Sequence, residues 1–244
     1  MEKKTAYAHL AKWFEYLNDD CGYENWSQYL IAKLSQFPLK TGIDIGCGGG
    51  WFTRSFQRHG YEMTGMDVSS EMLDFAQETA LKKGIRSNYV LGDISKTKLP
   101  FRFDFATAIN DCVNYLPKEK LGKAFKNVHA CLKKSGIFLF DISSERKFNE
   151  KIANTVSVDD RDDVTYISFN REETDGVTME VTLFVKTTDN LFERLEEIHR
   201  QYRYTEMEII AALENNGFEV LETEGHLGED KSQSDRITFL AKKR

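Results

Sequence analysis

Short apolar runs alternate with stretches of helical periodicity through the first part of the chain. The apolar runs, each of four or five residues, are 41–45, 62–66, 88–91, 105–109 and 137–140. Runs of this length bounded by polar or turn residues are typical of buried strands, and amphipathic segments between them are typical of crossover helices. The pattern predicts a parallel sheet with helices on both faces.

Capping and breaking residues give the ends of two of these helices. Ser69 is a suitable N-cap for a helix whose apolar positions recur at helical spacing until Gly84. Pro117 suits the first turn of a later helix, and we expect Gly136 to end that element.

The periodicity changes between about residues 149 and 204, where apolar and polar positions alternate with period 2. One strand face would carry four apolar residues: Met179, Val181, Leu183 and Val185. The turn dipeptide Asp175–Gly176 precedes this strand, and turn residues 187–190 follow it. We therefore predict a small antiparallel sheet, the insert, over residues 149–204.

The chain then returns to the parallel fold. Thr205 and Glu208 have the spacing of a capping box, so a helix is expected to begin there. Two further strands, 218–221 and 236–240, are joined by a stretch too short for a crossover helix and should pair as a hairpin. The predicted fold is α/β: a Rossmann-like, mostly parallel, seven-stranded sheet with a reversed last strand. Residues 1–148 and 205–244 form this domain, with an N-terminal helical segment.

Composition narrows the function classes. The 244 residues carry a formal charge of −6, which argues against a nucleic-acid partner that would need Lys and Arg contacts to phosphates. No apolar run approaches the roughly 20 residues that span a bilayer, so no membrane partner is expected. The four cysteines lack metal-ligand spacing, which predicts free thiols, no metal site and a cytoplasmic location.

The glycine-rich residues 46–50 follow the first predicted strand and open a helix. Glycines here let the backbone approach a ligand closely, and Asp67 at the end of the next strand can accept the ribose hydroxyls of an adenosine cofactor. A dinucleotide site needs a third glycine where this chain has Trp51. This difference argues against a competing interpretation as an NAD-dependent oxidoreductase.

The sequence resembles the class I S-adenosylmethionine-dependent methyltransferases. The resemblance covers about residues 40–140 and rests on four segments: 44–50 (DIGCGGG), 66–73 (MDVSSEML), 92–94 (GDI) and 103–106 (FDFA). The insert after the fifth strand is similar to that of small bacterial members, among them sugar N-methyltransferases. The resemblance implies S-adenosylmethionine as the cofactor and methyl transfer as the activity.

The resemblance also implies roles for individual residues. The glycines of the loop, Gly46, Gly48 and Gly50, would pass beside the methionyl part and ribose. Asp44 would hold the loop and the methionine ammonium group, and Asp67 would bind the ribose. The remaining cofactor contacts would come from Asp93 at the adenine amino group, Ile94 at the ring, Asn110 at the methionine end and Tyr7 in the N-terminal segment. For Tyr7 and its aromatic neighbours, packing at the edge of the domain is the alternative.

The acceptor is less determined by the sequence. We expect a small molecule; an RNA or protein acceptor is the alternative, and a non-catalytic cofactor-binding module is a third reading. No catalytic residue is fixed, and the candidates are His199, Asp111 and Tyr115. We expect the insert to cover the acceptor site with His199, Gln201 and Arg203. The alternative is a homodimer formed through the apolar face of the insert.

Overall fold

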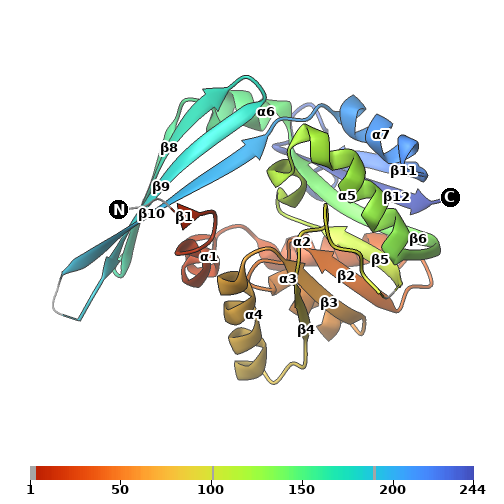
Figure 1. Ribbon diagram of the computed structural model, residues 1–244, viewed down its shortest axis with the longest axis horizontal. Helices are drawn as coiled ribbons and strands as arrows, with labels where there is room; N and C mark the ends of the chain where they lie inside the picture. Colours follow the sequence, from red (N-terminus) through yellow and green to blue (C-terminus); the bar gives the residue numbers. More distant parts are fainter. Residues whose placement is uncertain (1–3, 101, 189–190) are drawn as a thin grey trace.

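The computed structural model describes residues 4–100, 102–188 and 191–244. A seven-stranded sheet of order β11-β12-β6-β5-β2-β3-β4 forms the centre of the larger part (Figure 1). Only β12 runs antiparallel to its neighbours β6 and β11, which confirms the predicted fold class with its reversed last strand. The strands are β2 (Thr41–Ile45), β3 (Glu62–Asp67), β4 (Asn88–Leu91), β5 (Phe103–Ala108), β6 (Leu132–Ser143), β11 (Phe218–Gly225) and β12 (Arg236–Lys243).

Helices cover both faces of this sheet. The longer ones are α2 (Tyr23–Leu34), α3 (Trp51–Arg58), α4 (Ser70–Lys82), α5 (Lys118–Cys131) and α7 (Glu206–Asn215). Strand β6 shows why both faces are apolar, because successive side chains point to opposite sides. Phe138 and Phe140 pack with α5 and α7, whereas Ile137 and Leu139 pack with α2 and α3.

The capping residues predicted at the helix ends are confirmed in two places and corrected in two others. Ser69 caps α4 by accepting a hydrogen bond from the backbone of Met72, and the capping box at Thr205 is formed. Gly136 does not end the helix, since α5 ends at Cys131 and β6 begins at Leu132. Leu132 is fully buried and pairs with Phe103 of β5, so sheet pairing decides this boundary. Pro117 lies just before the first turn, at the N-cap.

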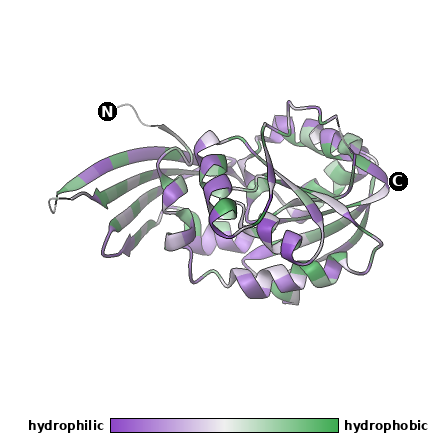
Figure 2. Ribbon diagram, turned by 90° about the horizontal axis from the view of Figure 1, so that it is seen from below, coloured by the Kyte–Doolittle hydropathy of each residue, from purple (hydrophilic) through white to green (hydrophobic). Residues whose placement is uncertain are grey.

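The insert is an antiparallel sheet of β7 (Val156–Asp160), β8 (Val164–Glu173), β9 (Gly176–Lys186) and β10 (Phe192–Tyr202), and the short β1 (Lys4–Thr5) pairs with β10. Hydrophilic and hydrophobic positions alternate along its strands (Figure 2). The predicted turn Asp175–Gly176 is shifted by one residue, because the β8–β9 loop consists of residues 174 and 175 and Gly176 already belongs to β9. A Cβ on Gly176 would lie 1.9 Å from the Gln201 carbonyl oxygen. Of the predicted turn 187–190, residues 189 and 190 lie outside the described residues.

The N-terminal segment lies against the inner face of the insert, the face that carries Met179, Val181 and Leu183 (Figure 1). It contains the short helices η1 (Leu10–Lys12) and α1 (Phe14–Leu17). Side chains of both pack into one apolar cluster with β8, β9 and β10. The apolar face that the sequence offered for a homodimer is therefore covered within the chain.

Four short helices complete the described part: η2 (Cys112–Tyr115), α6 (Glu145–Lys147), η3 (Phe148–Ile152) and η4 (His226–Gly228). Among the residues the structure describes, no helix combines the length and apolar character needed to cross a membrane.

Candidate active site

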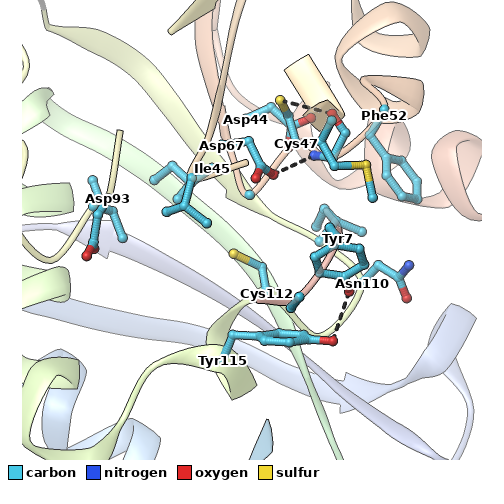
Figure 3. A pocket seen from close by; sticks show the side chains of 18 of the residues that line it. Tyr7, Asp44, Ile45, Cys47, Phe52, Asp67, Asp93, Asn110, Cys112 and Tyr115 are labelled. Carbon is cyan, nitrogen blue, oxygen red and sulfur yellow. Dashed lines mark hydrogen bonds between the residues drawn. The ribbon is translucent and has the colours of Figure 1, made fainter. Parts of the chain in front are cut away.

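Two cavities lie between the strand ends and the insert. The first, the strand-end cavity, has a volume of about 390 Å³ and is bounded by the residues that follow β2, β3, β4 and β5 (Figure 3). In open α/β sheets ligands bind in this place. All but one of the predicted cofactor residues line it: Tyr7, Asp44, Gly46, Gly48, Asp67, Asp93, Ile94 and Asn110.

Gly50 is the exception and has a packing role. All three predicted loop glycines have positive φ angles, of 65°, 52° and 78° for Gly46, Gly48 and Gly50. A Cβ on Gly46 would lie 2.2 Å from the Cys112 sulfur, whereas one on Gly50 would lie 2.5 Å from the Tyr89 hydroxyl. A Cβ on Gly48 would meet no atom closer than the Met72 sulfur at 3.9 Å, so this glycine is not required by packing.

Asp67, at the end of β3, links the glycine loop to the start of α4. Its Oδ2 accepts a hydrogen bond from the Gly48 backbone N–H at 2.8 Å, and its Oδ1 accepts one from the Ser69 N–H at 2.9 Å. Burial raises the pKa of the Asp67 carboxyl, although these two backbone hydrogen bonds oppose the shift. A carboxylate has about four acceptor positions, so two remain for a ligand in the cavity.

Asp44, at the end of β2, is buried beneath the loop. Its two oxygens accept hydrogen bonds from the hydroxyls of Thr53 (2.6 Å) and Thr107 (2.8 Å). Burial raises its pKa to about 6, with the two threonine hydrogen bonds opposing the shift. The carboxyl is therefore ionised at neutral pH and close to its titration range.

Asp93 and Ile94 follow β4 at the other end of the cavity. Burial would raise the pKa of Asp93, but hydrogen bonds from the Ser95 hydroxyl and backbone, with Lys96 nearby, hold it below its usual value. The Ile94 carbonyl oxygen accepts a hydrogen bond from the Asn127 side chain at 2.7 Å. This end of the cavity is therefore rigidly held.

The second cavity, the insert cavity, has a volume of about 420 Å³ and lies under the inner face of the insert. It is lined by His199 and Gln201 of β10, as expected, but Arg203 instead pairs with Glu172 and lies over the Phe148 ring. Four residues line both cavities: Tyr7, Phe14, Asn110 and Tyr115. The two cavities therefore meet at these side chains.

Three of the predicted residues form one hydrogen-bonded group at this junction. The Tyr7 hydroxyl donates to the Tyr115 hydroxyl at 2.9 Å, and the Tyr115 hydroxyl is 3.1 Å from Nδ1 of His199 (Figure 3 shows the tyrosine pair). Nε2 of His199 is 2.9 Å from Glu197. The Glu197 carboxylate also accepts hydrogen bonds from the backbone N–H groups of residues 7, 9 and 10. Glu197 thus attaches the N-terminal segment to the insert.

Asp111, the third catalytic candidate, is held in a buried cluster of charges. Arg236 pairs with Asp111 and Asp141, and Lys147 pairs with Asp111 at 2.9 Å. Burial would raise the pKa of Asp111, but the two cations lower it well below its usual value. The same Arg236 donates to the Asn110 side chain, and Asp141 accepts the backbone N–H groups of both Asn110 and Asp111. The cluster fixes the turn after β5, where both residues have positive φ.

Two other residues of this turn have structural roles. Asn114 is buried; its side chain accepts from the Ser143 N–H and donates to the Tyr202 carbonyl, at the carboxyl ends of β6 and β10. The Cys112 thiol faces the glycine loop, and burial raises its pKa, so it remains protonated. In the described part of the chain, no cluster of three or more His, Cys, Asp or Glu residues is arranged to hold a metal.

Comparison with known proteins agrees with this geometry. The sequence profile of a family described as a methyltransferase domain matches residues 43–136. One relative is YqeM of Bacillus subtilis (strain 168), which is named as a methyltransferase by provisional assignment. It is 30% identical over 97% of both chains. The chain belongs to the methyltransferase family. A crystal structure of an S-adenosylmethionine-dependent methyltransferase from Clostridium acetobutylicum ATCC 824 is 29% identical, with a TM-score of 0.86 and coverage of 95% of this chain and 96% of that one.

Another structure with this fold holds the cofactor. CalS10 from Micromonospora echinaspora, an amino pentose methyltransferase solved with S-adenosylmethionine bound, has a TM-score of 0.73 at 20% identity and covers both chains completely. The methyltransferase described here uses S-adenosylmethionine, and its strand-end cavity fits that cofactor chemically. The cofactor carries a sulfonium and an ammonium group, and buried carboxylates such as Asp44 and Asp67 complement positive charge.

Sequence reasoning did not identify several residues of the methyltransferase site. Glu197, Lys147 and Arg236 are not among the site residues predicted from the sequence. Their contacts link residues far apart in the chain: Glu197 is 190 positions from Tyr7, and Arg236 is 125 from Asp111. The one available signal was the period-2 pattern of β10, which places residues 197, 199 and 201 on the same strand face.

Proposed function

We propose that this methyltransferase transfers the methyl group of S-adenosylmethionine to a small molecule bound in the insert cavity. The observation that carries the proposal is the meeting of the two cavities at Tyr7, Phe14, Asn110 and Tyr115. A methyl group passes directly from donor to acceptor, so the two ligands must meet at one point. Both volumes lie within the range of about 300–1,000 Å³ that is typical of small-molecule sites.

The proposal assigns binding roles within the strand-end cavity. Asp67 accepts the ribose hydroxyls, Asp44 holds the methionine ammonium group, and Asp93 with Ile94 contacts the adenine. Gly46 and Gly48 allow the backbone to approach, and Asn110 and Tyr7 lie beside the reacting methyl. When bound, the cofactor supplies an activated methyl on a good leaving group. The chain then mainly has to align the acceptor and exclude water, and alignment alone is worth roughly 7–11 kcal/mol.

The insert provides the other wall of the proposed acceptor site, and residues 149–204 act as its cap. The formal charge of −6 supports a small acceptor over a nucleic acid. The described cysteines are all free, which supports a reducing compartment, the cytoplasm, as the location.

The test is a metabolite screen with methyl-labelled S-adenosylmethionine. The protein is incubated with a protein-free metabolite extract, and the release of S-adenosylhomocysteine is measured together with label in the small-molecule fraction. The proposal predicts a labelled small molecule. Label that enters only added RNA or protein would refute a small-molecule acceptor, and cofactor binding without any turnover would indicate a non-catalytic module.

A further inference from the structure

A continuous chain of hydrogen bonds runs from the junction of the two cavities into the insert. It begins at the Tyr7 hydroxyl, passes through the Tyr115 hydroxyl and ends at His199, with successive separations of 2.9 and 3.1 Å. The rings of Tyr7 and His199 are also in edge-to-face contact, 4.8 Å apart. His199 is 3% exposed and Tyr7 and Tyr115 are half-buried, so the His199 end of the relay is shielded from bulk water.

Glu197 fixes the direction of every hydrogen bond in the relay. Burial would raise its pKa, but hydrogen bonds from His199 and from the backbone of residues 9 and 10 lower it, so the carboxylate is ionised and only accepts. Nε2 of His199 therefore carries a hydrogen, and in the neutral tautomer that the relay requires, Nδ1 is an acceptor. Tyr115 then donates to Nδ1, and Tyr7 donates to Tyr115. The Tyr7 oxygen remains as an acceptor at the junction.

The charges of the insert cavity favour an uncharged acceptor group. Among the described residues that line it, both carboxylates are already paired, Asp111 with Lys147 and Arg236, and Asp159 with Arg161. An ammonium group would enter this space without an unpaired carboxylate to receive it, and burying an unpaired charge is costly. A hydroxyl group does not carry this cost, but its proton has to be removed as the oxygen is methylated.

Gln201 adds a second polar contact. Its side chain lines the insert cavity and is 7% exposed, and its Oε1 has no hydrogen-bond partner. A buried acceptor without a partner is unfavourable, so a ligand that supplies a donor there removes this cost. Gln201 therefore suits an acceptor with a second O–H or N–H near the hydroxyl that reacts.

From these observations, and resting on the proposed function, we infer that the acceptor is a hydroxyl compound and that its proton leaves along the relay to His199. The acceptor oxygen forms a bond to the methyl carbon, and the carbon–sulfur bond breaks with its electron pair remaining on sulfur. The O–H proton passes to Tyr7, the Tyr7 proton to Tyr115, and the Tyr115 proton to Nδ1 of His199. The imidazolium that forms is stabilised by Glu197, which is a positioning residue.

The first test identifies the atom that is methylated. The labelled product from the metabolite extract is formed with ¹³C-methyl S-adenosylmethionine, and its methyl carbon is examined by NMR, which separates O-methyl from N-methyl and C-methyl groups. An O-methyl product supports the inference. An N-methyl or C-methyl product overturns it and leaves the proposed function standing. The absence of any labelled small molecule overturns the proposed function itself, so the two failures are distinguishable.

The second test uses conservative variants. The acceptor is the unmethylated form of the product that the first test identifies. Tyr115→Phe and His199→Gln should each lower kcat by about 100-fold or more, the scale of positioned acid–base catalysis, with a much smaller change in acceptor KM. Gln201→Met should instead raise KM. Tyr61→Phe is the matched control, because it removes a phenol hydroxyl from a side chain packed on Phe105, outside both cavities.

A measurement without turnover completes the test. ¹⁵N NMR of the His199 ring in the full-length protein should show the Nε2–H tautomer, and Glu197→Gln should alter it. Unchanged kcat in both the Tyr115 and His199 variants would overturn the relay, as would an Nδ1–H tautomer in the wild-type protein.

Discussion

Replacing Asp67 by alanine tests the cofactor site most directly. The carboxylate uses one acceptor position of each oxygen on the Gly48 and Ser69 backbone and has two left for the ribose hydroxyls. Hydrogen bonds to a charged group are each worth about 1.5–3 kcal/mol. Water can replace part of a deleted side chain, so we expect a net loss of about one such bond. This corresponds to a Kd for S-adenosylmethionine that is about 10- to 150-fold weaker.

Isothermal titration calorimetry gives the affinity, and Asp104→Ala is the matched control. Asp104 also accepts backbone N–H groups, those of residues 40 and 41, but at the opposite end of the sheet. Asp104 also accepts from the Thr41 hydroxyl and pairs with Lys133, so thermal melting without ligand should show Asp104→Ala to be destabilised at least as much as Asp67→Ala. Only the Asp67 variant should lose affinity. Unchanged affinity in a folded Asp67→Ala protein would remove Asp67 from the site.

Three further predictions follow from the geometry. The pKa of Asp44 is about 6, and its ionised form would hold the cofactor's ammonium group, so the affinity for S-adenosylmethionine should be level above pH 6 and fall up to about tenfold per pH unit below it. Calorimetry from pH 5 to 8 should find a flatter profile in Asp44→Asn. Identical profiles in the two proteins would refute this role. Arg236→Leu leaves Asp111 and Asp141 buried together and should lower the free energy of unfolding in urea by about 3–5 kcal/mol. The matched variant of an exposed arginine, Arg194→Leu, should change it by no more than about 0.5 kcal/mol. Equal changes would contradict a stabilising cluster. Gly46→Ala should lower the melting temperature of the protein more than Gly84→Ala does. Both glycines have φ near 66°, but only at Gly46 would a Cβ clash with another atom, the Cys112 sulfur. Equal melting temperatures would contradict this clash.

The parallel domain could be predicted from sequence because its signals are local. A strand segment buried on both faces is apolar without interruption, as in residues 137–140 of β6, and the acidic residues Asp44 and Asp67 lie at the carboxyl ends of β2 and β3. Strand β7 was not predicted as a separate element, because this short segment has only two apolar side chains, Val156 and Val158, and both are exposed at the edge of the insert sheet. The apolar face of the insert was recognised, but not the segment that covers it.

The contacts that assemble the candidate site could not be predicted in this way. The hydrogen bonds between Glu197 and the N-terminal backbone form only once the insert has folded and the segment lies against it. Register also decides their partners: Glu197 pairs with Val181 and His199 with Met179, so the polar and apolar residues share one face. From the sequence alone, the polar residues of β10 were expected to face the acceptor site and the apolar residues of β9 were considered as a separate dimer surface.

The position of Asn114 has a consequence for engineering chimeric enzymes. This one side chain, on the cofactor-binding domain, is bonded to the backbone of Ser143, the last residue of β6, and of Tyr202, close to the end of the insert. Both bonds use backbone groups, and only Tyr202 belongs to the insert, so an insert of different sequence can keep them. The Glu197 contacts differ, because a carboxylate is required to hold the backbone of residues 7, 9 and 10 of the host. A transplanted insert should therefore change acceptor preference and retain cofactor binding only if it brings an acidic residue at that register of its last strand.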